Sequence, residues 1–147
     1  MAETHELLGD GAGEIDMLIN VGRLRGGDSA YVQDEIAAVV DAAGNVIVKA
    51  ILETAYLDRE QKILGCQLAE AAGAAFVKTS TGFAARGATA ADVALMRESV
   101  SAHVSVKAAG GVRDLDTVLE LLDAGAVRFG STSTGVILHE LAIRHAR

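Results

Sequence analysis

Short apolar runs alternate with polar, helix-like intervals along the whole chain. The runs are rich in valine and isoleucine and are bounded by glycine, a pattern typical of buried strands. They lie at 14–20, 46–53, 76–80, 104–108 and 127–130. Their hydrophobicity is nearly continuous, which favours a parallel sheet covered on both faces.

The intervals between the runs carry the start and stop signals of helices. Asp28, Asp58 and Thr89 are placed to cap helices at their N-termini. Gly44 and Gly73 follow two of these segments and predict where they end. In the interval after residue 114, one apolar stripe predicts the buried face of a further helix: Leu115, Val118, Leu119 and Leu122.

Strands alternating with helices predict an α/β fold with right-handed crossovers. Two architectures fit this order: an open doubly wound sheet and an incomplete (β/α)8 barrel. A complete barrel needs about 200–250 residues, and the chain has 147, enough for five units. No GxGxxG or P-loop motif follows a strand, which counts against a nucleotide-binding open sheet. The spacing therefore favours the barrel slightly, and we expect residues 1–147 to form a single domain.

Composition narrows the class of protein. Half of the residues are hydrophobic and 22% are charged, so the chain can build a core. A single cysteine, Cys66, excludes an internal disulfide and indicates a reducing, cytoplasmic location. The longest apolar runs fall short of the roughly 20 residues of a spanning helix, and the N-terminus lacks a signal-peptide pattern. The net charge of −7 argues against nucleic-acid binding.

Three of the four lysines lie inside the predicted strands, which is unusual because lysine is rarely buried without a partner. Lys49, Lys78 and Lys107 follow one another at intervals of 29 residues, the length of one strand plus its crossover helix. Strand parity predicts that these lysines, Asp16 and Glu53 all face the barrel interior. One interpretation is a structural ion network, in which Lys49 pairs with Glu53 or Asp16.

The other interpretation is amine chemistry. A lysine attacks a carbonyl only when it is unprotonated, so the pKa of such a lysine must fall from about 10.4 toward neutrality. A second cation nearby, together with desolvation, has this effect. Lys78 and Lys107, on adjacent predicted strands, fit that arrangement, and Asp16 can relay protons through water. The pattern thus predicts Schiff-base chemistry on an aldehyde or ketone.

Four segments resemble the deoxyribose-phosphate aldolase family: GEIDMLINVGRL, FVKTSTGF, VSVKAAGGVR and VRFGSTSTG. They occur in order and at compatible spacing over nearly the whole chain. The resemblance implies a TIM barrel that is incomplete here, with five βα units equivalent to strands four to eight. It also implies a class I aldolase that reversibly cleaves 2-deoxy-D-ribose 5-phosphate to acetaldehyde and D-glyceraldehyde 3-phosphate, with no metal or other cofactor.

Roles follow from this resemblance, position by position. Lys78 of FVKTSTGF is expected to be the Schiff-base nucleophile, and Lys107 of VKAAGG to assist it. Asp16 of EIDM is expected to be the acid/base partner, and Lys49 a supporting member of the polar network. The residues expected to bind the substrate phosphate are Gly82, Gly110, Gly111, Gly130, Thr132 and Ser133.

The chain departs from the family at its N-terminus, where the resemblance begins with the helix before the fourth strand. Two sheet edges would then lack partners, so we expect self-association as a homo-oligomer through the open edges. Two other functions stay open. One is another Schiff-base enzyme, such as a transaldolase-like or fructose-phosphate-type aldolase. The other is a catalytically silent fragment that binds phosphosugars.

Overall fold

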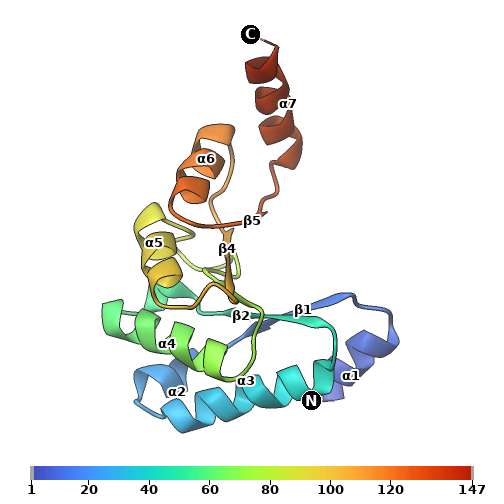
Figure 1. The fold of residues 1–147 in the computed structure, drawn as a ribbon, viewed down its shortest axis with the longest axis vertical. Helices are drawn as coiled ribbons and strands as arrows, with labels where there is room; N and C mark the ends of the chain where they lie inside the picture. Colours follow the sequence, from blue (N-terminus) through green and yellow to red (C-terminus); the bar gives the residue numbers. More distant parts are fainter. Residues whose placement is uncertain (1, 147) are drawn as a thin grey trace.

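A computed structural model describes residues 2–146 and shows five strands that alternate with helices (Figure 1). The strands are β1 (Glu14–Leu18), β2 (Ile47–Ile51), β3 (Phe76–Lys78), β4 (Ser105–Ala109) and β5 (Arg128–Gly130). The helices are α1 (Ala2–Gly9), α2 (Val21–Arg25), α3 (Ser29–Ala43), α4 (Arg59–Ala71), α5 (Ala90–Glu98), α6 (Leu115–Asp123) and α7 (Thr134–His145), with a 3-10 turn at Thr54–Tyr56. All five predicted strands are present, each within two residues of its predicted start.

The strands form one parallel sheet in the order β1-β2-β3-β4-β5. Five strands at a spacing of about 4.8 Å would place the outer two roughly 19 Å apart in a flat sheet. Instead, Glu14 of β1 and Arg128 of β5 touch, with Nη1 2.6 Å from Oε2. The sheet is therefore strongly curved, and its concave face is the interior of a half-barrel.

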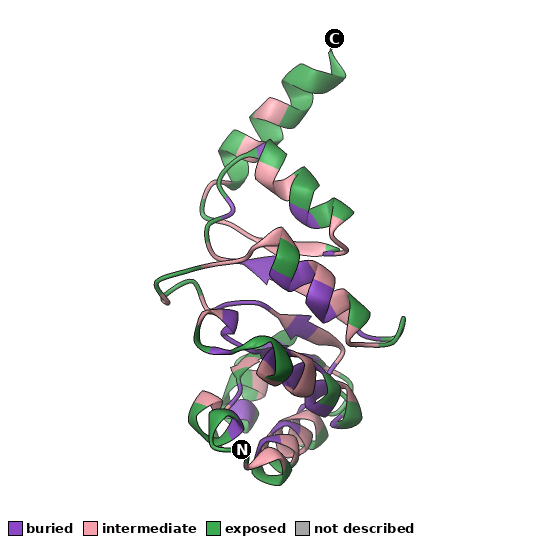
Figure 2. Cartoon of the chain, turned by 90° about the vertical axis from the view of Figure 1, so that its left-hand side faces the viewer, coloured by how far each residue is buried: buried purple, intermediate pink, exposed green. Residues whose placement is uncertain are grey.

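The convex face of the sheet packs against the helices. Alternate strand residues point toward this layer and are almost completely buried, among them Val48, Ala50, Val77, Val106 and Ala108. All but Val48 join one continuous aliphatic core with residues of α3, α4, α5 and α6, and Val48 packs in a smaller cluster with Ile15 and Ala43; buried segments are purple in Figure 2. Because side chains alternate along a strand, the residues between them face the concave side, which is where the charged side chains lie.

The predicted helix caps are confirmed. Asp28 accepts a hydrogen bond from the backbone N–H of Tyr31, and Thr89 from that of Asp92. Asp58 and Gln61 form a reciprocal capping box at the start of α4. These caps satisfy N–H groups that have no partner within the helix, and so fix where each crossover helix begins.

The C-terminal part differs from the expectation. In α6, Leu115 and Leu121 are buried, whereas Leu119 and Leu122 are 37% and 47% exposed, so the predicted stripe is only half correct. Beyond it, α7 projects from the end of the sheet (Figure 1), and none of its twelve residues is buried. Part of the apolar face of α6 is therefore not covered by any other segment among the described residues.

The structure holds no helix, between residues 2 and 146, with the length and apolar character needed to cross a membrane.

Candidate active site

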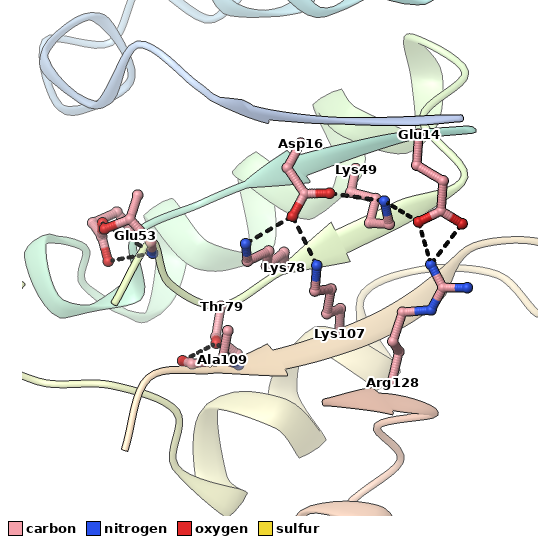
Figure 3. Close-up of polar contacts among 10 residues, drawn as sticks. Glu14, Asp16, Lys49, Glu53, Lys78, Thr79, Lys107, Ala109 and Arg128 are labelled. Carbon is pink, nitrogen blue, oxygen red and sulfur yellow. Dashed lines mark hydrogen bonds and ion pairs between the residues drawn. The ribbon is translucent and has the colours of Figure 1, made fainter. Parts of the chain in front are cut away.

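The strand lysines meet around one carboxylate, that of Asp16 on β1 (Figure 3). Lys49 on β2 places its Nζ 2.8 Å from Asp16 Oδ1. Lys78 on β3 and Lys107 on β4 each place Nζ 2.8 Å from the other oxygen, Oδ2. Three ammonium groups from three consecutive strands thus share a single carboxylate. The convergence predicted from strand parity is confirmed.

Burial decreases across this cluster. The exposed fraction of the side chain is 2% for Lys49, 11% for Lys78, 16% for Lys107 and 27% for Asp16. Partial burial alone would raise the pKa of Asp16, but the hydrogen bonds from Lys107, Lys49 and Lys78 outweigh it and hold the pKa well below the usual value of an aspartate. Asp16 is therefore a charged carboxylate at neutral pH, able to accept a proton.

The second carboxylate of the cluster is Glu14, and the expectation that Glu53 would join it is wrong. Lys49 Nζ lies 2.7 Å from Glu14 Oε2. The strand β2 ends at Ile51, and Glu53 adopts a left-handed conformation with φ of 54°, so the parity of β2 no longer applies to it. Its carboxylate instead accepts hydrogen bonds from the backbone N–H and the hydroxyl of Thr81.

A cavity of about 350 Å³ opens beside Lys78 and Lys107 at the carboxyl ends of the strands. This is the end of a (β/α)8 barrel at which active sites form. Five of the six residues predicted to bind phosphate line it: Gly82, Gly110, Gly111, Gly130 and Thr132. A larger hollow of about 700 Å³ runs along β1 beside α1 and α3. It contains Asp16 but none of the lysines, whereas the smaller cavity is lined by Lys78 and Lys107.

Ser133 is the exception among the predicted phosphate ligands. It does not line the cavity, and its backbone N–H donates to Ser131 Oγ at 2.8 Å. Sequence reasoning missed three side chains that do line it: Thr81, Arg113 and Ser131. Arg113 is the last residue of the VSVKAAGGVR segment. Its position just after a glycine pair was the sequence signal that could have predicted a cation at this end of the site.

Two loops at the mouth of the cavity are packed backbone to backbone. Ala88 N–H, in the loop after β3, donates to the carbonyl of Gly110, in the loop after β4, at 3.0 Å. A Cβ atom on Gly87 would lie 2.2 Å from the same carbonyl oxygen. Only glycine at position 87 permits this approach, so the loop bearing Gly82 and the loop bearing Gly110 and Gly111 are fastened together.

The fourth lysine, Lys62, forms a separate ion pair between helices. Its Nζ lies 2.7 Å from Asp92 Oδ1, and Arg86 Nη1 lies 2.9 Å from Asp92 Oδ2. Burial acts to raise the pKa of Asp92, but the bond and charge of Lys62 and the charge of Arg86 keep it lowered. The partially exposed Arg86 is thus tied to Asp92. Cys66 is fully buried, and burial raises the pKa of its thiol to about 12.

No cluster of three or more histidine, cysteine, aspartate or glutamate side chains within residues 2–146 is arranged to hold a metal ion.

Comparison with known proteins identifies the family. The model of a family described as "DeoC/LacD family aldolase" matches residues 1–138. A deoxyribose-phosphate aldolase from Brevibacillus brevis is 52% identical over 135 residues, which make up 92% of this chain and 61% of that protein. A solved structure described as QR15, an aldolase, superposes with a TM-score of 0.93 at 36% identity and covers 99% of this chain, which spans 66% of it.

A tetrameric deoxyribose phosphate aldolase from Aeropyrum pernix superposes with a TM-score of 0.87 at 28% identity, over 96% of this chain and 60% of its own. The chain therefore spans about three-fifths of the length of the relatives it matches. These neighbours confirm the predicted fold class, five βα units of a (β/α)8 barrel. The chain belongs to the DeoC/LacD family of aldolases.

Proposed function

We propose that this site carries out the reaction of deoxyribose-phosphate aldolase, the reversible cleavage of 2-deoxy-D-ribose 5-phosphate to acetaldehyde and D-glyceraldehyde 3-phosphate. The observation that carries the proposal is the pair of ammonium groups, Lys78 and Lys107, on the same oxygen of Asp16 beside the cavity. Two cations so close disfavour each other, so one amine is more easily deprotonated. The relatives named deoxyribose-phosphate aldolase, one of which is 52% identical to this chain, support the same chemistry.

Lys78 is the nucleophile in this proposal. It transfers a proton to the site and attacks the substrate aldehyde carbon to form a carbinolamine, which loses water to give a protonated imine. The C2–C3 bond then breaks: a base takes the proton of the C3 hydroxyl, C3 becomes the aldehyde carbon of D-glyceraldehyde 3-phosphate, and the electron pair of the broken bond moves toward the iminium nitrogen. D-glyceraldehyde 3-phosphate leaves and an enamine remains on Lys78. Protonation of the enamine carbon and addition of water release acetaldehyde and restore the amine.

Asp16 and Lys107 divide the proton transfers. Asp16 is ionised at neutral pH because the three ammonium groups hold its pKa low. In this proposal it exchanges protons, directly or through water, once one of the neighbouring amines has become neutral. Lys107 bears the proton that can be donated, and its positive charge favours the neutral form of the Lys78 amine. Lys49 stays on the other oxygen of Asp16, almost completely buried, in a supporting role.

The phosphate group would bind at the glycine-rich end of the cavity. Gly82, Gly110, Gly111 and Gly130 allow the backbone N–H groups there to approach an anion, and Thr132 adds a hydroxyl. Ser133 belongs to the same proposed set, through its place at the start of α7. Arg113, which also lines the cavity, adds a positive charge suited to a dianion.

Borohydride reduction in the presence of acetaldehyde tests the proposal. We expect an ethyl group on Lys78, located by mass mapping, because reduction traps the imine. Lys62 in the same digest serves as the internal control, and Lys78→Met as the matched variant that should not be labelled. An adduct chiefly on Lys107 or Lys49 would contradict the assignment of the nucleophile.

Product analysis separates the remaining functions. Acetaldehyde released from 2-deoxy-D-ribose 5-phosphate supports the proposed reaction, whereas transfer of a dihydroxyacetone unit indicates a transaldolase-like or fructose-phosphate-type aldolase. Binding of the phosphosugar without any trapped adduct indicates a silent binding fragment. We also propose a cytoplasmic location, with which the single, buried cysteine agrees. We further propose that residues 1–147 act as one domain.

We also infer that copies of this chain associate. The outer strands β1 and β5 each have one neighbour among the described strands, and unpaired edges bind other chains. Exposed apolar side chains gather on α7: Val136, Leu138, Leu141 and Ile143. Light scattering should show a mass above that of one chain. A monomer at all concentrations up to the solubility limit would contradict the inference.

A further inference from the structure

The concave face contains an ion pair that the proposed chemistry does not use. Arg128 on β5 places Nη1 2.8 Å from Glu14 Oε1 and 2.6 Å from Oε2. The two residues are 114 positions apart and come from the two outer strands of the sheet. The guanidinium also lies over the ring of Phe76, 5.1 Å from its centroid, a typical cation–π distance. The side chain of Arg128 is thus held on two sides.

Glu14 links this pair to the reactive cluster. Its Oε2 contacts both Arg128 and, at 2.7 Å, the Nζ of Lys49. Lys49 in turn contacts Asp16 Oδ1. Cations and carboxylates therefore alternate without a break from Arg128 through Glu14 and Lys49 to Asp16, as the dashed lines in Figure 3 show. The hydrogen bond from Arg128, followed by that from Lys49, lowers the pKa of Glu14 to about 2, so Glu14 remains charged.

We propose that Glu14 and Arg128 act on the Asp16 cluster in opposite ways. Glu14 is a positioning residue that keeps the Lys49 ammonium on one oxygen of Asp16, which leaves the other oxygen to Lys78 and Lys107. Arg128, held by Glu14 and by the ring of Phe76, adds positive charge to the same face. The role of Lys78 in this statement rests on the proposed function. Without Glu14, the almost completely buried Lys49 would have only Asp16 as a charged partner. The Asp16 carboxylate would then be drawn toward Lys49 and away from the two lysines at the cavity.

The charge balance gives the pair a second effect. Lys78, which shares its cavity with Arg113, lies on a concave face to which the other four strands bring charged groups: Glu14 and Asp16 on β1, Lys49 on β2, Lys107 on β4 and Arg128 on β5. Together with Lys78 these are four cations and two carboxylates. Removing the charge of Glu14 adds to the excess of positive charge and favours the neutral Lys78 amine. Removing the charge of Arg128 reduces the excess and favours the ammonium. The two changes act in opposite directions.

The test measures how readily the Lys78 amine reacts as a function of pH, without relying on turnover. The full chain is labelled with trace acetic anhydride at a series of pH values between roughly 6 and 11, a range that includes the ordinary pKa of lysine. A reference peptide in the same solution gives the reactivity of a free lysine. Mass spectrometry then follows acetylation of Lys78. We expect the midpoint to move down in Glu14→Gln and up in Arg128→Gln, each by on the order of half a pH unit. Arg128→Lys, which keeps the charge, should stay near the parent value.

Loss of folding would act differently, because it would move both midpoints toward that of the reference peptide. Midpoints that move in the same direction in Glu14→Gln and Arg128→Gln, or that do not move, would overturn the proposal. Arg128→Lys gives a second decision: if its midpoint follows that of Arg128→Gln, the charge of the pair is not what acts on Lys78.

A charge exchange separates positioning from simple cross-linking of β1 and β5. In the double variant Glu14→Arg with Arg128→Glu, the ion pair between the outer strands is kept, but a cation now faces Lys49. We expect the denaturant midpoint of unfolding to recover relative to the single variants, while trapping of acetaldehyde on Lys78 stays at least severalfold slower than in the parent. Recovery of both would mean a purely structural pair. If the parent itself fails to trap acetaldehyde, the proposed function fails, whereas opposite acetylation shifts would still support the positioning role.

Discussion

Two aspartates in this chain bind buried lysines, under different charge balance. Asp92 lies between helices and has one cation on each oxygen, Lys62 and Arg86. Asp16 lies on the concave face of the sheet and has three ammonium groups on two oxygens. The Asp92 side chain is 7% exposed and that of Asp16 is 27% exposed. None of the three side chains of this cluster, Asp92, Lys62 and Arg86, lines the cavity of Lys78 and Lys107.

Under the proposed function, the comparison indicates which features distinguish a reactive lysine from a structural one. Burial and a short ion pair are common to both clusters, so neither feature identifies chemistry. The Asp16 cluster differs in having more cations than carboxylates and in opening to a cavity. An excess of positive charge lowers the cost of releasing one proton, and a cavity admits a carbonyl.

Removing the Lys107 ammonium should show most clearly that the Asp16 cluster, unlike the Asp92 cluster, takes part in the proposed chemistry. In Lys107→Met, we expect acetaldehyde trapping at Lys78 near neutral pH to slow by at least about 10²-fold, the size typical of a lost acid/base group. The reason is that, without Lys107, Lys78 is the only cation on Asp16 Oδ2. Its amine then keeps its proton and does not attack the aldehyde. Trapping rates from quenched mass spectrometry measure this. A near-normal rate would show that Lys107 is structural.

The matched change in the other cluster is Lys62→Met, which should lower stability and leave chemistry intact. Asp92 would retain only Arg86, whose side chain is 47% exposed. We expect a loss of about 2 kcal/mol in the free energy of unfolding, less than the roughly 3–5 kcal/mol of a fully broken buried ion pair, because one charged partner remains. Urea unfolding measures the loss. A tenfold fall in the trapping rate at unchanged stability would contradict the separation of the clusters.

Acid should weaken the Asp92 cluster by a smaller amount. Its pKa is lowered in the folded chain, so the unfolded chain binds more protons at acidic pH. The stabilisation is therefore complete above the unfolded pKa of about 3.9 and is lost as the pH falls through the folded value. The urea midpoint should decline below about pH 4, and less steeply in Asp92→Asn. Asp41→Asn, at an exposed position on α3, is the control. Equal slopes in all three proteins would exclude Asp92 as a source.

Sequence patterns predicted much of the fold because the strands are short, apolar and regularly spaced. The interval of 29 residues between the lysines placed Lys49, Lys78 and Lys107 on successive strands, and parity placed them on one face. Parity also fails where a strand ends. Glu53 lies two residues past β2 in a left-handed conformation, and no strand pattern predicts that turn. Glu14, two residues before Asp16, shares its face and could have been found by the same counting.

Other parts of the site depend on contacts between distant segments. Nothing in the neighbourhood of Lys62 indicates that Asp92, thirty positions later, is its partner. The pairing of Glu14 with Arg128 requires the curvature of the whole sheet. In α6, a helical stripe predicted buried leucines, but Leu119 and Leu122 are exposed because the described part of the chain places little against them. Local periodicity predicts which face is apolar and cannot say what covers it.

The close packing of Gly87 on Gly110 has a consequence for how the two loops respond to a ligand. The Ala88 amide hydrogen is held by the Gly110 carbonyl, so it can exchange with solvent deuterium only when the loops separate. Any anion that immobilises the backbone at Gly110 must also slow exchange at Ala88, although residue 88 does not line the cavity. Amide exchange at Ala88 would therefore report on ligand binding in the neighbouring loop.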